Sequence, residues 1–97
     1  MSLDIILRPK ARRDLIEIWN YTRESWGADQ AETYTNDLKL AIERIADHSG
    51  LGSGRDYVRP GLRKLTVGSH AIYYFHDERI LRVARILHVS MDIERAL

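Results

Sequence analysis

Cysteine is absent from the sequence, proline occurs only twice, and no long hydrophobic run is present. Without cysteine, the fold cannot depend on disulfide bonds or on a thiolate metal site, and a reducing compartment is permitted. No segment approaches the roughly 18 apolar residues of a membrane-spanning helix, and the N-terminus lacks the apolar stretch of a signal peptide. We therefore expect a cytoplasmic protein with no membrane partner.

The length and composition indicate one folded domain over residues 1–97. A chain of 97 residues can bury one modest core, and its hydrophobic fraction of 44% and charged fraction of 30% are far from the composition of disordered proteins. The net charge is only +1, so we expect no strong direct binding to nucleic acid.

The charges are nevertheless segregated along the chain. Residues 1–13 carry four basic and one acidic side chain, residues 14–48 carry three basic and eight acidic, and residues 54–88 carry seven basic and three acidic. If the middle of the chain is helical and the later part is a sheet, the helices are acidic and the sheet is basic. A basic sheet face suits an acidic partner.

The N-terminal part has the pattern of a strand that leads directly into a helix. Residues 3–8 are rich in apolar and β-branched side chains, and Pro9 suits the first position of a helix. Gly27 is predicted to end that helix. Residues with a helical period form its inner face: Ala11, Leu15, Ile18, Trp19, Thr22 and Trp26.

A second helix is predicted to follow after a few residues. Asp29 suits its N-cap, Glu32 completes a capping box, and Gly50 supplies a left-handed stop. Two helices so close in sequence should form an antiparallel hairpin whose apolar faces share one partner. The inner face of the second helix comprises Ala31, Tyr34, Leu38, Ala41, Ile42 and Ile45.

Three strands rich in β-branched and aromatic residues, 62–67, 70–76 and 79–89, supply that partner. They are joined by two-residue turns, Gly68-Ser69, which suits type II′, and Asp77-Glu78. The glycine-rich segment 49–61 leads from a helix into a strand, the reverse of a phosphate-binding loop, so we interpret it as a connector. The fold class is therefore predicted to be α+β. It comprises an N-terminal strand, an antiparallel helical hairpin and a mainly antiparallel sheet of three further strands.

The last strand has apolar residues on both faces, which predicts that the helices cover one face and a partner covers the other. Strict alternation places Leu81, Val83 and Leu87 on one face. It places Ile80, Ala84 and Ile86 on the opposite face.

The end of this strand, "RILHVSMD", contains groups that resemble parts of an active site. Ribonuclease chemistry without a metal requires a base, an acid and cations close to the phosphate. Arg85 and His88 are three residues apart, so a regular strand directs them to opposite faces unless a bulge intervenes. The sequence therefore predicts no convergent acid–base set.

No local pattern predicts a metal or cofactor site. The histidines, His48, His70, His76 and His88, show no spacing with carboxylates that would build a metal site. Ser90 lies on the same strand face as His88, but no oxyanion-hole element accompanies them. We therefore expect no cofactor, no metal and no catalytic residue.

Four stretches together resemble the ParE branch of the RelE/ParE toxin superfamily. The helices contribute "WNYTRESWG" and "AETYTNDLKLAIERIADH", and the sheet contributes the more specific "VRPGLRKLTVGSHAIYYF" and "RVARILHVSMD". The resemblance implies a RelE/ParE-like toxin of a type II toxin–antitoxin pair. Such a toxin inhibits DNA gyrase by binding and is neutralised by a ParD-type antitoxin wrapped around it.

Two alternatives stay open, a RelE-type endoribonuclease that cleaves messenger RNA and an α+β interaction module without toxicity. The missing acid–base set favours the gyrase-directed interpretation. On that interpretation, the residues that contact the target are predicted to be His88, Ser90, Met91 and Asp92. An exposed methionine among polar groups suits such a contact surface. An acidic antitoxin tail that orders on binding would contact the cations Arg63, Lys64, Arg82 and Arg85.

Overall fold

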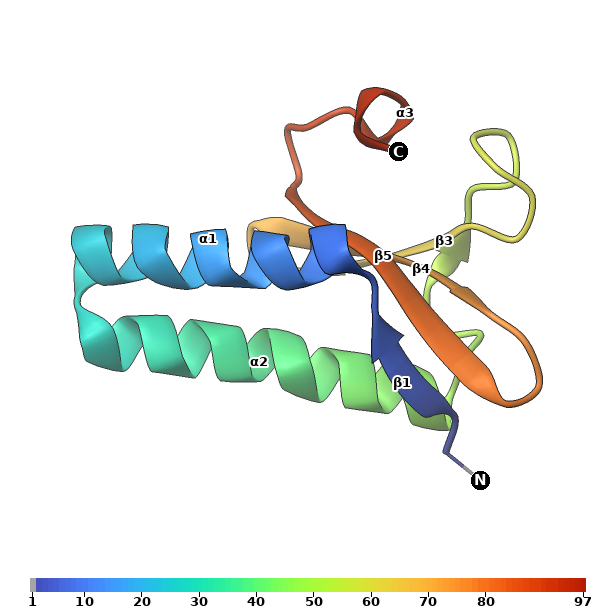
Figure 1. Ribbon diagram of the computed structural model, residues 1–97, viewed down its shortest axis with the longest axis horizontal. Helices are drawn as coiled ribbons and strands as arrows, with labels where there is room; N and C mark the ends of the chain where they lie inside the picture. Colours follow the sequence, from blue (N-terminus) through green and yellow to red (C-terminus); the bar gives the residue numbers. More distant parts are fainter. Residues whose placement is uncertain (1) are drawn as a thin grey trace.

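The computed structural model describes residues 2–97, and two long helices lie along one face of a five-stranded sheet (Figure 1). The sheet order is β1-β5-β4-β3-β2, in which β1 is parallel to β5 and all other neighbours are antiparallel. The predicted α+β class is confirmed. No helix in residues 2–97 has the length and apolarity needed to cross a bilayer. The elements are β1 (Asp4–Leu7), α1 (Pro9–Trp26), α2 (Ala28–Asp47), β2 (Ser53–Gly54), β3 (Arg63–Val67), β4 (His70–His76), β5 (Ile80–His88) and α3 (Ile93–Ala96).

The two long helices meet at a single residue, Gly27, which has a φ of +94°. Its N–H donates to the carbonyl of Arg23 at 2.8 Å, and its carbonyl accepts from the N–H of Ala31 at 3.1 Å. Glycine adopts this positive φ without the steric cost that other residues incur. One residue therefore ends α1 and caps α2.

The predicted caps of the second helix are wrong. Asp29 lies inside the first turn of α2, and no side chain caps the helix, because Gly27 leaves no room for a longer break. Gly50 does not have a positive φ, since α2 has already ended at Asp47 with His48 as its C-cap. Sequence signals for helix ends compete locally, and here the nearest glycine determined the junction.

The turns between the strands are close to those predicted. Gly68 has a φ of +57° in the hairpin between β3 and β4, as its place in a tight turn requires. The second turn is shifted by one residue, because Asp77 Oδ1 accepts from the N–H groups of Arg79 and Ile80, both at 2.8 Å. These two backbone hydrogen bonds, and then a hydrogen bond from the Arg82 side chain, lower the pKa of Asp77 to about 2.

The connector between α2 and β3 is partly a strand, which corrects its interpretation as irregular throughout. Ser53 and Gly54 pair with β3 as the edge strand β2. The hydroxyl of the fully buried Tyr74 holds the segment, since it donates to the Ser49 carbonyl at 2.8 Å and accepts from Gly52 N–H at 2.9 Å. A Cβ on Gly52 would lie 2.8 Å from the Lys64 carbonyl, so this close approach requires glycine.

A β-bulge in β5 overturns the predicted division of its faces. Tyr73 pairs with Arg85 and Tyr74 pairs with Val83, so Ala84 is an extra residue without an opposite partner. After the bulge the alternation is reversed. Ile86 therefore joins Leu81 and Val83 in the core beneath the helices, and Leu87 faces the other side.

Part of the face of the sheet away from the helices is covered by the chain itself. Ala71, Tyr73 and Leu87 form a second buried cluster there, together with Leu62 and with Ile93 of α3. Figure 1 shows α3 on the side of the sheet away from α2. The short terminal helix therefore completes a small second core.

Candidate functional site

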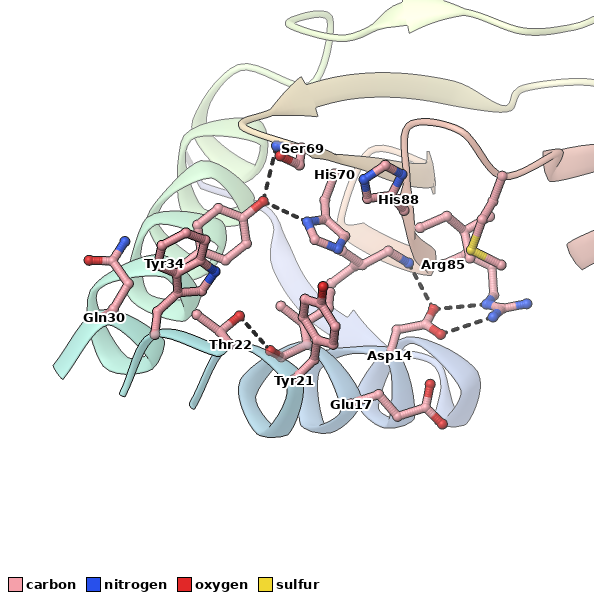
Figure 2. A pocket seen from close by; sticks show the side chains of 15 residues that line it. Asp14, Glu17, Tyr21, Thr22, Gln30, Tyr34, Ser69, His70, Arg85 and His88 are labelled. Atoms are coloured by element: carbon pink, nitrogen blue, oxygen red, sulfur yellow. Dashed lines mark hydrogen bonds and ion pairs between the residues drawn. The ribbon is translucent and has the colours of Figure 1, made fainter. Parts of the chain in front are cut away.

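An open groove lies between α1 and the free half of β5 (Figure 2). Because β1 ends at Leu7, opposite Val83, no strand within residues 2–97 pairs with residues 84–88 on the β1 side of β5, whereas β4 pairs with the other side. Helix α1 runs past this edge instead. The groove has a volume of about 920 Å³, and its walls include the exposed aromatic side chains of Tyr21 and Trp26.

Asp14 and Arg85 form a two-point ion pair at one end of this groove. Arg85 Nε donates to Asp14 Oδ2 at 2.8 Å, and Nη2 donates to Oδ1 at 2.9 Å. The pair is largely buried, with side-chain exposures of 16% for Arg85 and 8% for Asp14. Hydrogen bonding to Asp14 raises the pKa of Arg85, so the guanidinium stays charged.

The same two side chains connect three elements. Asp14 Oδ2 also accepts from the backbone N–H of Ile86 at 2.9 Å, which satisfies a donor on the unpaired edge of β5. Arg85 Nη1 donates to the carbonyl of Ala96 at 2.7 Å and holds the end of α3. Helix α1, strand β5 and helix α3 are therefore joined through one carboxylate and one guanidinium.

A chain of polar side chains lies along the sheet side of the groove. The hydroxyl of Tyr34 accepts from Ser69 N–H at 3.1 Å and lies 2.5 Å from Nδ1 of His70. The His70 ring packs edge-on against His88, its cross-strand neighbour, with ring centroids 5.6 Å apart. Burial, and then the proximity of His88, lower the pKa of His70, while Asp14 opposes the shift.

The hydrogen bonds assign the proton on one of the two imidazoles, that of His88. Nδ1 of His88 accepts from the backbone N–H of Ser90 at 3.1 Å, so the neutral ring carries its proton on Nε2. The Tyr34 hydroxyl accepts from Ser69 N–H and has a second lone pair, so its hydrogen bond with Nδ1 of His70 is compatible with either tautomer of that ring. Nδ1 of both rings is therefore occupied in a hydrogen bond, and neutral His88 presents an N–H donor at Nε2.

The predicted target-binding residues lie together. His88, Ser90, Met91 and Asp92 follow one another at the end of β5 and are all exposed, and Met91 is 51% exposed. His88 and Met91 also line the groove. Asp92 has a structural task as well, because its side chain accepts from the N–H of Glu94 and caps α3.

The predicted antitoxin-binding cations are not brought together. Arg63 donates to the carbonyls of Gly50 and Gly52, and Lys64 lies over the Tyr73 ring at 5.9 Å. Arg82 forms an exposed pair with Asp77 at 3.2 Å, and Arg85 is bound to Asp14. Two of these residues are on β3 and two on β5, with β4 between them.

Asp14, Tyr34 and Ser69 are site residues that reasoning from the sequence missed. Asp14 did leave a signal, because it interrupts the inner face of α1 between Ala11 and Ile18 and is itself only 7% exposed. A carboxylate at a core position requires a buried partner. Tyr34 was predicted as core, and its hydrogen bonds depend on where β4 places His70.

Comparison with known proteins gives matches across nearly the whole chain. The family described as "ParE toxin of type II toxin-antitoxin system, parDE" matches residues 5–93. Toxin ParE1 of Mycobacterium tuberculosis (strain H37Rv) is 44% identical over 98 residues, with 100% of both chains covered. Toxin ParE1 of Caulobacter vibrioides is 38% identical over 89% of this chain and 88% of its own. The solved structure titled "Chromosomal ParDE TA system from P. aeruginosa" has a TM-score of 0.79 at 21% identity, over 92% of this chain and 98% of that one.

The importance of the ion pair can be tested by Asp14→Asn. This change should lower the free energy of unfolding by about 3 kcal/mol, because it leaves the guanidinium of Arg85 largely buried without its counter-charge. Urea denaturation measures the effect. Asp37→Asn is the matched control and should change stability far less, since Asp37 is exposed on α2 and takes part in none of the ion pairs within residues 2–97. Equal losses in the two variants would contradict the central role of Asp14.

The partly buried imidazole of His70 predicts a dependence of stability on pH. Because the pKa of His70 is lowered below 6.5, the unfolded chain takes up this proton before the folded protein does. The free energy of unfolding should therefore decrease as the pH falls through 6.5. In His70→Gln the decrease between pH 7.5 and 5.5 should be smaller, whereas a variant of the exposed His48, His48→Gln, should behave as wild type. Identical pH profiles for His70→Gln and wild type would refute this assignment.

Proposed function

Because the chain belongs to the ParE toxin family of type II toxin–antitoxin systems, we propose that it inhibits DNA gyrase by binding and is neutralised by a ParD-type antitoxin. Identity to ParE toxins over 89–100% of this chain supports this proposal. The family assignment is also consistent with a protein that is not an enzyme.

Binding, as opposed to catalysis, is supported by the state of the polar groups in the groove. The cation that would stabilise a phosphate, Arg85, is already neutralised by Asp14. Nδ1 of both His70 and His88 is occupied in a hydrogen bond, so neither ring offers that nitrogen as a free general base. This observation carries the proposal, because all these groups are committed to hydrogen bonds that shape a surface.

The target contact is proposed at the exposed chain exit, residues 88–92, and in the adjoining groove. Met91 is 51% exposed and lines the groove, and the unbranched side chain of methionine suits an adaptable contact. Arg85 and Asp92 act on this segment indirectly, since they hold the two ends of α3. A rigid support on both sides lowers the ordering cost of binding.

The antitoxin is proposed to bring an acidic segment to cations of the sheet. Of the expected contacts, Lys64 and Arg82 are partly exposed and available to carboxylates. Arg63 and Arg85 would contribute by positioning, because carbonyl groups and Asp14 already occupy their donors.

A RelE-type endoribonuclease is the second candidate, and the grouping of Tyr34, His70 and His88 in one groove favours it. These side chains lie on the same surface although they come from α2, β4 and β5. Loss of the Tyr34 hydrogen bond or of the Ser90 contact would free a nitrogen lone pair. A direct assay separates the two functions.

Purified protein should inhibit supercoiling by gyrase, or trap cleaved DNA with gyrase, and leave ribosome-bound messenger RNA intact. Plasmid topology on agarose gels and primer extension on translated messenger RNA provide the two measurements. Codon-specific RNA cuts together with unaffected gyrase would replace the gyrase proposal by the ribonuclease.

Truncation of the exposed Met91 tests the chain exit. Met91→Ala should weaken gyrase inhibition by about tenfold, since a central apolar contact at an interface typically contributes 1–2 kcal/mol. Leu40→Ala is the matched control, because Leu40 is 56% exposed but lies on α2 outside the groove. If both variants inhibit gyrase as wild type does, the exit is not the contact.

A further inference from the structure

A second cleft, with a volume of about 380 Å³, lies beside the start of α1. Three segments bring cations to it: Arg8 and Lys10 from the start of α1, Arg59 from the loop before β3, and Arg85 from β5. We call these four residues and the space between them the basic cleft. Small or apolar residues line the rest of it, namely Pro9, Ala84, Ala96 and Leu97.

The cations at the entrance of the basic cleft are not neutralised. Within residues 2–97 there are three ion pairs, and none involves Arg8, Lys10, Arg59 or the carboxylate of Leu97. No acidic side chain lines the cleft, and the first turn of α1 contains none. The lining of the cleft therefore carries net positive charge: Arg8, Lys10 and Arg59 outnumber the terminal carboxylate of Leu97, whereas Asp14 already neutralises Arg85.

The entrance is preformed in its backbone and in the side chain of Arg8. The Arg8 guanidinium lies over the Phe75 ring at 5.2 Å, and its backbone N–H donates to the Val83 carbonyl at 3.0 Å. The backbone of Arg59 is held at 3.3 Å by the Arg55 carbonyl and at 3.1 Å by Leu62 N–H. Preformed cations lose less conformational entropy when a ligand binds.

The β-bulge gives the cleft its floor. Ala84 is the extra residue of β5, is 2% exposed and lines the cleft with a single methyl group. A larger side chain at this position would fill the space between α1 and the loop that carries Arg59. The bulge that reverses the faces of β5 thus also makes room for a ligand.

We propose that the basic cleft binds a carboxylate-rich peptide segment, of the kind that the acidic tail of an antitoxin would supply. Arginine forks pair with carboxylates at two points, and a concave apolar floor receives the methylene groups of Glu side chains. Duplex DNA fits less well, because its backbone is convex and strongly hydrated and the rest of the chain leaves the net charge at only +1. The identity of the partner as an antitoxin depends on the proposed function, whereas the peptide chemistry does not.

The position of the cleft suggests how a bound segment would neutralise the protein. Arg85 lines both the basic cleft and the groove, so a segment that leaves the cleft along α1 enters the groove next. From Lys10 to Trp26 the helix rises about 24 Å, which an extended peptide of about seven residues spans. One acidic segment bound in the cleft therefore places its neighbours over the proposed target contact.

A fluorescein-labelled peptide of six alternating Glu and Ala pairs is the probe, and fluorescence anisotropy with the full chain measures its binding. The variant Lys10→Gln with Arg59→Gln should weaken binding at least tenfold. The matched control, Lys39→Gln with Arg44→Gln on α2, removes the same charge away from the cleft and should stay within twofold of wild type. Circular dichroism verifies that both variants are folded, and the affinity of wild type should fall as salt is raised.

Equal weakening in both double variants would overturn the proposal, because attraction would then depend on net charge alone. Absence of peptide binding to wild type would overturn it too. Tighter, cleft-dependent binding of a labelled 12-base-pair DNA duplex would replace it by a nucleic-acid site. A gyrase assay separates this outcome from the proposed function: wild type that binds the peptide through the cleft but leaves gyrase active supports the cleft and refutes the gyrase activity.

Discussion

The ion pair of Asp14 and Arg85 is the interaction on which the arrangement of this protein depends. It joins the first long helix to the free edge of β5 and the terminal helix to both. Water is largely excluded from both partners, so the pair is costly to break, although an apolar pair of equal shape could be as stable. What the pair contributes is position: it fixes α1 at a distance from β5 that leaves open space on either side.

Those two spaces have different chemistry because different segments line them. The groove on one side receives aromatic residues from α1 and imidazoles from the sheet, whereas the basic cleft on the other receives cations from three segments. The guanidinium of Arg85, which Asp14 neutralises, lies between the two spaces and lines both. The protein is proposed to bind both a target and an antitoxin. Because the groove and the basic cleft share Arg85, an antitoxin bound at the cleft can exclude the target from the groove without a conformational change.

Several features were predictable because they depend on local periodicity. The apolar stripes of residues 11–26 and 31–45 gave the helices, and the tight turns at Gly68 and Asp77 gave the hairpins within one residue. Gly27 ends the first helix as predicted, but the caps of the second helix were predicted wrongly, since Gly27 and Asp29 both satisfy the local rules and the shorter junction formed. The predicted alternation of faces along β5 was wrong beyond Ala84, where the bulge reverses it. A bulge depends on the packing of the two neighbouring strands and is not indicated by the sequence of the strand itself.

The sequence by itself determined the α+β class, the order of the main elements and the family, since periodicity, turn residues and motifs are properties of neighbouring positions. Only the tertiary structure decided which polar residues act together. Asp14 and Arg85 are 71 residues apart, and Tyr34 and His70 are 36 apart, so no local pattern connects them. They meet because the core buries α1 and α2 on one face of the sheet, and a buried charge or hydroxyl must then find its partner across the fold.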